Sequence, residues 1–236
     1  MKTNTLGKNG PEQSRPSLVN FAGVIFDMDG VLCDSEDFMA EAATAMFAEA
    51  HGVTVLPEEF RPFRGMGEDR YLGGVAKNHG VTLNLPADKH RAYEIFLQRI
   101  RGRLKALPGA LEFVAACRRR GLKLAVATSA DRMKLAGMLL EIGLLPDRFD
   151  AIVTGDDIAH KKPDPEIFLT AAKRLGLPAA ACLVVEDAGS GVRAAKAAGS
   201  RCLALTTSLD AGTLRSLGAD WVAGDLAHLP ADLTVP

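Results

Sequence analysis

Short apolar runs alternate with helix-like patterns along most of this chain. The first run, at residues 22–26, has no polar alternation, which is typical of a parallel strand buried on both faces. Further strands are expected at 122–128, 151–154, 182–185, 201–205 and 221–222. Helix patterns fall between them, at 110–120, 132–142, 165–175, 191–198 and 209–217. This alternation predicts an α/β fold with a Rossmann-like parallel sheet.

The segment 34–104 breaks the alternation, because it carries helix patterns and no convincing strand. Helices are expected over 36–50, from Pro57 onward, over 71–79 and over 88–101, with a loop at 64–68. Pro108-Gly109 marks the return to the strand–helix pattern. The segment is therefore predicted to be an inserted all-helical domain.

The resulting domain division has three parts. Residues 1–18 are polar and contain no apolar signal core, so they are expected to be a disordered lead-in. The main domain is expected to comprise 19–33 and 105–236, and the helical cap domain 34–104. The two domains are expected to join near residues 33–35 and 105–108.

Composition narrows the class of function. The net charge of −1 argues against a nucleic-acid binder, and no apolar run is long enough for a membrane span. Four scattered cysteines form no CxxC pair, which suits reduced thiols in a reducing compartment. A cytoplasmic protein is therefore expected. A monomer is compatible with the sequence, which leaves the oligomeric state open.

Polar side chains follow directly after several of the expected strands. They are Asp27 and Asp29 after the first, Thr128 and Ser129 after the second, Lys162 beyond the third, and Glu186 and Asp187 after the fourth. The carboxyl ends of parallel strands lie at one edge of a sheet, so these groups are expected to gather there. Carboxylates are hard ligands for Mg²⁺, and a lysine with a hydroxyl suits a phosphoryl group.

Each of these residues alone has a simpler interpretation. Asp187 or Thr128 can cap a helix, Lys162 can be a solvated surface lysine, and Glu186 can form a structural ion pair. Only the ordered set favours a catalytic site.

That ordered set resembles the haloacid dehalogenase (HAD) superfamily. The matching motifs are DMDGV at 27–31, AVATS at 125–129, KPDP at 162–165 and VVEDAGSG at 184–191. The subgroup with a helical cap after the first strand, which contains phosphatases and β-phosphoglucomutase-like proteins, is the most similar. Residues 60–76 also resemble the cap of the HAD domain in the plant chloroplast suppressor-of-quenching protein. That narrower resemblance adds the chloroplast stroma as an alternative location.

The resemblance implies a role for each motif residue. Asp27 would be the nucleophile that forms an aspartyl-phosphate, and Asp29 the general acid and then the general base. Lys162, Thr128 and Ser129 would hold phosphoryl oxygens. Asp29 favours phosphoryl transfer, since the family branch that cleaves carbon–halogen bonds generally lacks this second acid.

A Mg²⁺ cofactor is implied in the same way. Its site would be formed by four acids, Asp27, Asp29, Glu186 and Asp187. The charge of Mg²⁺ and of Lys162 would offset the repulsion between a phosphate and a carboxylate.

The loop between residues 64 and 69 is expected to contact the substrate, with Gly65 and Glu68 as candidates. In related sugar-phosphate mutases this loop carries an arginine for a second phosphate, and Glu68 stands at that position. An acid there would repel a phosphate, although Arg64 or Arg70 could substitute. Glu68 could equally be a helix-start residue favoured by the helix dipole.

The sequence thus predicts a Mg²⁺-dependent phosphatase acting on a small phosphorylated metabolite. Two alternatives remain open. One is a phosphosugar mutase of the same fold, and the other is a regulatory HAD domain of a larger chloroplast protein.

Overall fold

The structure of the chain is a computed structural model that describes residues 18–65 and 67–233. The expected disordered lead-in, apart from residue 18, lies outside the described residues.

Six parallel strands form one sheet in the order β3-β2-β1-β4-β5-β6. Their bounds are β1 Gly23–Phe26, β2 Lys123–Ala127, β3 Ala151–Val153, β4 Cys182–Glu186, β5 Arg201–Leu205 and β6 Trp221–Ala223. The α/β fold with a Rossmann-like parallel sheet is therefore confirmed. Strand β1 lies between β2 and β4. The chain runs outward from β1 through β2 to β3 and then crosses to β4 on the other side of β1, so the strand order reverses there. Ligand sites of open α/β sheets lie beyond the strand ends at such a point.

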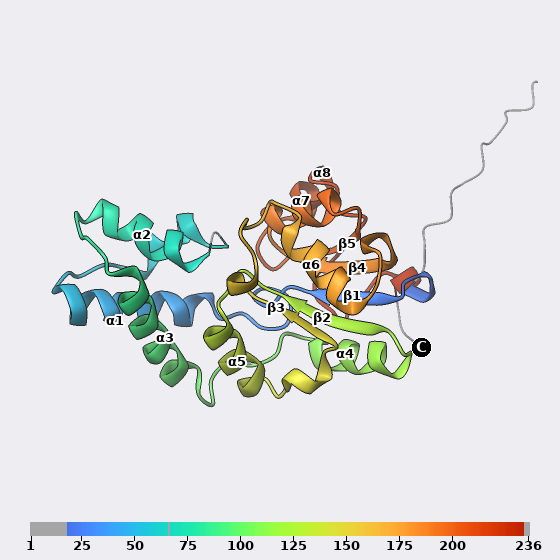
Figure 1. Cartoon of the computed structure of the whole chain (residues 1–236), viewed down its shortest axis with the longest axis horizontal. Coiled ribbons are helices and arrows are strands. Elements are labelled where there is room, and N and C mark those ends of the chain that lie inside the picture. The colour runs from blue at the N-terminus through green and yellow to red at the C-terminus, as the bar shows by residue number, and fades with distance from the viewer. Residues whose placement is uncertain (1–17, 66, 234–236) are drawn as a thin grey trace, which may run out of the picture.

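Helices cover both faces of the sheet (Figure 1). Their bounds are α4 Ala110–Arg119, α5 Arg132–Glu141, α6 Glu166–Leu175, α7 Gly189–Ala197 and α8 Ala211–Ser216. Val24 and Phe26 of β1 pack in one apolar cluster with α4 and α5, and Ile25 packs in a second cluster with α6, α7 and α8. Alternate side chains of the central strand are therefore buried on opposite faces, as the unalternated apolar run predicts.

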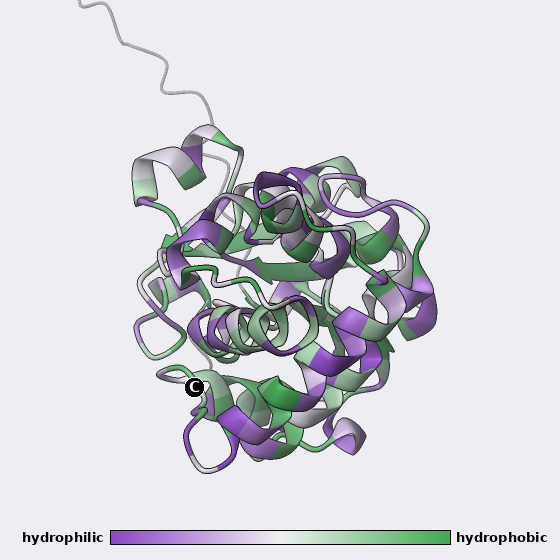
Figure 2. Ribbon diagram, turned by 90° about the vertical axis from the view of Figure 1, so that its left-hand side faces the viewer, coloured by the Kyte–Doolittle hydropathy of each residue, from purple (hydrophilic) through white to green (hydrophobic). Residues whose placement is uncertain are grey.

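The hydrophobic residues are concentrated inside these layers. Figure 2 shows green strands at the centre of the ribbon, with the hydrophilic residues mainly on the surrounding helices and loops. All four cysteines are buried and free, and no helix among the described residues is long and apolar enough to cross a membrane.

Residues 34–104, called here the inserted segment, lie to one side of the sheet (Figure 1). They form α1 Glu36–His51, the 3₁₀ helix η2 Pro57–Phe63, α2 Glu68–Asn78 and α3 Leu85–Ile100. No strand occurs within the described part of this segment. Its division from the rest as a separate domain stays a prediction.

Two elements of the inserted segment show features that the sequence pattern did not predict. The helix from Pro57 is a 3₁₀ helix, with Pro62 inside it, where proline removes a backbone donor. Helix α2 begins at Glu68, earlier than the expected start at 71, because Gly67 adopts a φ of +84° and starts the helix. Glu68 therefore belongs to a helix rather than to the loop.

The two connections to the inserted segment lie side by side. Cys33 and Ala106 form an isolated antiparallel bridge, and the backbone N–H of Leu107 donates to the carbonyl of Leu32 at 2.9 Å. The chain therefore leaves the sheet and returns to it at one place.

Candidate active site

Most residues singled out in the sequence line one cavity of about 740 Å³. The set comprises Asp27, Asp29, Gly65, Glu68, Thr128, Ser129, Lys162, Glu186 and Asp187. The backbone explains this convergence at two strand ends. The amide of Asp27 donates to Val185 at 3.0 Å and that of Thr128 to Val153 at 3.0 Å, so both residues continue the ladder of the sheet.

Lys162 is a buried cation in the floor of this cavity. Its Nζ lies 2.5 Å from Asp27 Oδ1 and 2.5 Å from Glu186 Oε1, and 4.9 Å from the ring centroid of Phe168. Burial opposes its charge, but the carboxylates of Asp27 and Glu186 outweigh burial and raise the pKa of Lys162. The lysine is therefore charged and is not a solvated surface residue.

Asp27 combines burial with a crowded electrostatic environment. The pKa of Asp27 is raised to about 7, because burial and the Glu186 and Asp29 carboxylates together outweigh the lowering effect of Lys162. Neither Asp27 nor Lys162 is withdrawn from the cavity, since both line it. Asp27 is thus an acid whose negative charge is only partly compensated by the protein.

Glu186 is held entirely by protein donors. One oxygen contacts Lys162, and the other accepts the backbone N–H groups of Asp187 and Ala188 at 2.9 and 3.0 Å. The carboxylate also fills the space where Gly191 has no side chain. Glu186 therefore forms the structural ion pair that its simpler interpretation suggests, next to the residue that it would support.

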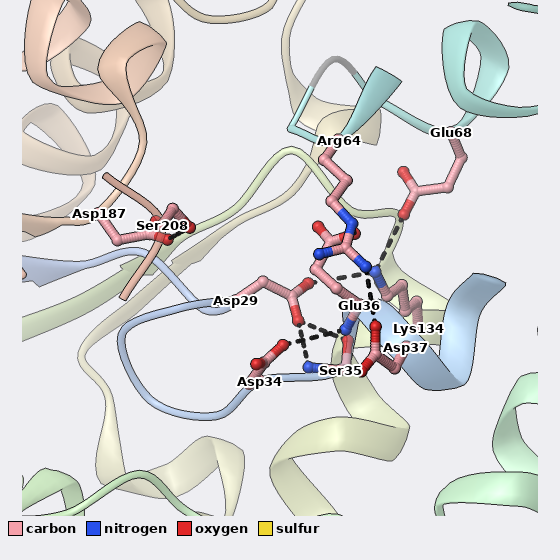
Figure 3. Close-up of polar contacts among 10 residues, drawn as sticks. All are labelled: Asp29, Asp34, Ser35, Glu36, Asp37, Arg64, Glu68, Lys134, Asp187 and Ser208. Atoms are coloured by element: carbon pink, nitrogen blue, oxygen red, sulfur yellow. Dashed lines mark hydrogen bonds and ion pairs between the residues drawn. The ribbon is translucent and has the colours of Figure 1, made fainter. Parts of the chain in front are cut away.

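Asp187 is fixed by the loop after β5. The hydroxyl group of Ser208 donates to its Oδ2 (Figure 3). Thr207 Oγ1 lies 3.3 Å from the same oxygen and 2.6 Å from the carbonyl of Gly30. Gly30 has a φ of +75°, and a side chain there would collide with Asp187. Burial raises the pKa of Asp187 well above its ordinary value, and the Glu186 and Asp27 carboxylates add to this.

Thr207 and Ser208 are not among the site residues predicted from the sequence. The signal was present, because the polar run Thr206-Thr207-Ser208 directly follows the apolar run at 201–205. It is the same pattern that marked the ends of the other strands.

The donor set fits Mg²⁺ best at Asp27 and Asp187. Burial raises the pKa of both acids, and the Asp27 carboxylate also raises the pKa of Asp187, so a divalent cation near them would stabilise both charged forms. Protein donors contact one carboxylate oxygen of Asp27 and one of Asp187. In the other two predicted metal-site acids, donors among the described residues engage both oxygens. Glu186 is held as described, and Asp29 is held by Ser35 and Lys134.

One compact group of three acid or histidine ligands exists among the described residues, and it lies elsewhere. It consists of His160, Asp164 and Glu166. Glu166 accepts hydrogen bonds from the backbone of Ala159 and His160, which makes the group a local feature of the turn before α6.

Ser129 carries a buried hydroxyl that has no hydrogen-bond partner among the described residues. Buried polar groups are normally paired, so an unpaired hydroxyl lining a cavity points to a ligand. Thr128 Oγ1 accepts the N–H of Ala130 at 3.1 Å, which leaves the hydroxyl proton of Thr128 available for donation. Both hydroxyl groups suit an oxyanion.

Asp29 is tied to two other residues by its two oxygens (Figure 3). Oδ1 accepts the hydroxyl and the backbone N–H of Ser35 at 2.5 and 3.1 Å. Oδ2 lies 3.1 Å from the Nζ of Lys134, which also lies 3.3 Å from Glu68 Oε1. Sequence reasoning missed Lys134, because a lysine in the first turn of a helix usually points to solvent.

The loop of the inserted segment reaches the cavity through several residues. Arg64 lines the cavity and forms ion pairs with Glu36 at 3.4 Å and with Asp37 at 2.8 Å. Arg70 is exposed and is not among the residues that line it. Burial raises the pKa of Glu68, with Lys134 opposing that effect. Glu68 is therefore both the first residue of α2 and part of the cavity wall.

The fold and this cavity define an α/β enzyme with an acid–lysine site at the carboxyl ends of its strands. The haloacid dehalogenase-like hydrolase family matches residues 21–199, and the chain belongs to that family. The resemblance seen in the four motifs is thereby confirmed.

Known proteins similar to the chain include both long and short relatives. It is 45% identical over 211 residues to protein SUPPRESSOR OF QUENCHING 1, chloroplastic, of Arabidopsis thaliana, covering 88% of this chain and 20% of that protein. It is 35% identical to the phosphorylated carbohydrates phosphatase of Thermotoga maritima, covering 80% of this chain and 87% of that one.

Solved structures of CbbY from Rhodobacter sphaeroides are also similar. The structure in complex with phosphate matches with a TM-score of 0.78 and 27% identity, and covers 88% of this chain and 95% of that chain. A mutant of CbbY in complex with xylulose-(1,5)bisphosphate matches with a TM-score of 0.77, at the same identity and coverage.

Proposed function

We propose that the protein is a Mg²⁺-dependent phosphatase that hydrolyses a small phosphorylated metabolite through an aspartyl-phosphate. The observation that carries this proposal is the buried contact between Lys162 and Asp27 at the end of the central strand. In this contact the carboxylate that we propose as the nucleophile lies beside a fixed cation, in a cavity of metabolite size. The names of the Thermotoga phosphatase and of phosphate-bound CbbY support the same substrate class.

In the first half-reaction an oxygen of Asp27 attacks the phosphorus atom and the bond to the leaving oxygen breaks. Lys162, Thr128 and Ser129 hold the phosphoryl oxygens, and Asp29 gives its proton to the leaving oxygen. When bound, Mg²⁺ held by Asp27 and Asp187 supplies positive charge that offsets the repulsion between phosphate and carboxylate.

In the second half-reaction Asp29, now ionised, takes a proton from a water molecule. The oxygen of that water attacks the phosphorus atom, the aspartyl–phosphate bond breaks, and Asp27 and inorganic phosphate are released. Splitting the reaction in this way replaces one difficult displacement with two easier ones.

The substrate side of the cavity is formed by the inserted segment. Gly65 and Glu68 stay predicted substrate contacts, and both line the cavity. The ion pair of Glu68 with Lys134 disfavours the mutase alternative, because a cation needed for a second phosphate is absent from the Glu68 position and Lys134 is already paired. Arg64 is the remaining cation of this loop in the cavity wall.

A phosphometabolite screen tests the proposal. Phosphate release would be measured with Mg²⁺ on sugar monophosphates, sugar bisphosphates and phosphorylated small acids, with acid-quenched samples examined by mass spectrometry for one added phosphoryl group on Asp27. Isomerisation of a sugar phosphate without net phosphate release would support the mutase instead. Absence of both turnover and phosphoenzyme on the whole panel would support the regulatory-domain alternative.

The similarity to known proteins also bears on the cellular compartment of the protein. The sequence suggests the cytoplasm, and the 45% identity to a chloroplastic protein favours the stroma as the alternative. Fractionation of the native cells with an antibody to this chain distinguishes the two locations.

A further inference from the structure

Lys134 is a buried cation that the proposed reaction steps leave without a role. Its side chain is 4% exposed, and its Nζ lies 5.4 Å from the ring centroid of Phe96. Burial opposes the charge, yet the Asp29, Glu68 and Glu36 carboxylates raise the pKa of Lys134 well above its ordinary value. A charged group placed this deep needs a reason, because apolar residues of similar size commonly serve stability as well or better.

The contacts of Lys134 join the region around the sheet to the inserted segment. Lys134 lies on α5 of the sheet region, and Asp29 follows β1. Glu68 is the first residue of α2, in the inserted segment. Figure 3 shows the ammonium group between the two carboxylates. One lysine therefore links a cavity acid at the sheet edge to a helix of the inserted segment.

A second ion pair joins the same two regions without touching Asp29. Lys89 of α3 lies 2.8 Å from Asp131, the residue before α5, and 2.9 Å from Asp69 of α2. The beginning of α5 thus holds the inserted segment by two lysine bridges. Only the bridge through Lys134 reaches an acid of the cavity.

Lys134 lines the cavity, but most of its hydrogen-bonding capacity is already used within the protein. Two of its three ammonium donors are directed at Asp29 and Glu68, and Phe96 covers another side. What the lysine controls is the carboxyl group of Asp29, whose other oxygen is held by Ser35. With both oxygens held, the rotation of this carboxyl group is fixed.

We infer that Lys134 is a positioning residue that orients Asp29 toward the leaving oxygen, and that Glu68 in turn fixes Lys134. The inference rests on the proposed phosphatase function, in which Asp29 transfers a proton to the leaving oxygen as the phosphorus–oxygen bond breaks. Lys134 neither gains nor loses a proton in this step. Correct placement of a proton donor is a large part of general acid catalysis.

If Lys134 orients Asp29, the loss of rate in a Lys134 variant should depend on the leaving group of the substrate. p-Nitrophenolate is a weak base and leaves without a proton, whereas phenolate is a stronger base and benefits from one. Misplacing Asp29 should therefore slow phenyl phosphate hydrolysis much more than p-nitrophenyl phosphate hydrolysis. A purely structural defect would slow both substrates by the same factor.

The experiment measures kcat/KM for both aryl phosphates with Mg²⁺ in the full chain. For Lys134→Met, the ratio of the p-nitrophenyl to the phenyl value should rise about tenfold or more over the wild-type ratio. Lys134→Arg, which keeps a cation between the two acids, should restore most of the ratio. Glu68→Gln should give a smaller rise, since it weakens only the support of Lys134.

Lys89→Met is the matched control, because it removes the neighbouring bridge and leaves Asp29 untouched. Its ratio should equal that of the wild type, whatever happens to the absolute rates. A wild-type ratio in Lys134→Met would overturn the inference. If Lys134→Met does not fold, as judged by circular dichroism, a wild-type ratio in Glu68→Gln would overturn it instead.

Failure of the proposed function gives a different result. A wild-type protein that hydrolyses neither aryl phosphate and forms no phosphoenzyme would refute the phosphatase, and the inference with it. A wild type active on both substrates, with equal losses in Lys134→Met, would refute the inference alone.

Discussion

The Nζ of Lys162 lies 2.5 Å from Oδ1 of Asp27, in the floor of a cavity at the end of the central strand. The two residues are 135 positions apart in the sequence, and the parallel sheet brings them together. In the proposed mechanism the Asp27 carboxylate approaches a phosphate, and the Lys162 cation reduces the repulsion between them.

Asp27→Asn should abolish phosphatase turnover and leave the protein folded. An amide has nearly the same shape as the carboxylate but is a poor nucleophile. Activity should therefore fall by at least about a thousandfold, which is typical when an enzyme loses a catalytic residue. Rapid-quench trapping should detect a phosphoenzyme in the wild type and none in the variant. Turnover by Asp27→Asn at the wild-type rate would rule out the covalent mechanism.

Mg²⁺ should stabilise the protein through Asp187 as well as support activity. Ligand binding to the folded state raises the melting temperature, so wild-type protein treated with EDTA should gain several degrees when millimolar Mg²⁺ is added. Asp187→Asn should lose this gain. Asp164→Asn, in the exposed group with His160 and Glu166, is the control and should keep it. The reverse pattern would move the metal site to the surface group.

Ser129→Ala should weaken substrate binding without destabilising the free protein. The hydroxyl of Ser129 has no partner among the described residues, so its removal should change the unfolding free energy by no more than about 1 kcal/mol, in the stabilising direction. The KM should rise about tenfold, as for loss of a hydrogen bond to a charged group.

Ser200→Ala is the matched control for that variant. Ser200 is also a serine with a buried side chain, but its Oγ donates to the carbonyl of Ala179 at 2.9 Å. Its loss should reduce the unfolding free energy and leave KM unchanged. A Ser129→Ala protein with wild-type KM would remove Ser129 from the substrate site.

Glu36 should make stability depend on pH. Burial, and then the charge of Asp29, raise the pKa of Glu36 from 4.5 to about 7, so the folded protein binds this proton more tightly than the unfolded chain. The contribution of Glu36 to stability therefore falls as the pH rises from about 4.5 to about 7. Glu36→Gln should raise the unfolding free energy at pH 8 by roughly 1–3 kcal/mol and change it little at pH 4.

Urea unfolding at the two pH values measures this effect. Glu41→Gln, on the outer side of the same helix, removes an ion pair with Arg99 at 3.1 Å and should change stability by less than about 1 kcal/mol. If Glu36→Gln changed the unfolding free energy equally at pH 4 and pH 8, the pKa of Glu36 would not be raised in the folded protein.

Glu68→Arg should shift substrate preference toward bisphosphorylated sugars. The substitution replaces a carboxylate of the cavity wall with a guanidinium group that can hold a second phosphate in two hydrogen bonds. It also leaves Lys134 with one fewer acid, so turnover of monophosphates should fall. The measurement is the ratio of KM values for a sugar monophosphate and its bisphosphate. An unchanged ratio would mean that Glu68 acts only within the protein.

The elements that the sequence predicted well are those with a local cause. Apolar runs such as 22–26 and 182–185 are strands because their composition requires burial on both faces, and the polar residues after them lie at the same sheet edge as a result. Lys134 could not be found in this way. Its burial depends on Asp29 and Glu68, which are 105 and 66 positions away, and nothing near Lys134 in the sequence marks it.

Local geometry explains the smaller errors. The start of α2 at Glu68 depends on the positive φ of Gly67, a conformation that the sequence permits but does not require. Pro62 lies within a 3₁₀ helix where an α-helix was expected. The contacts of Thr207 and Ser208 with Asp187 have a different cause, because they depend on the pairing of β5 with β4.

The hydrogen bond between Leu107 and Leu32, 2.9 Å long, has a consequence for how this molecule can change. Because the inserted segment leaves the sheet region and returns to it at one point, it affects the neighbouring strands no more than a short turn would. It can be lengthened, shortened or exchanged while the strands on either side keep their register and their polar ends. A graft of the corresponding helices from a relative, made between residues 33 and 106 and keeping Ser35 and Glu68, should therefore transfer selectivity while the proposed chemistry at Asp27 persists.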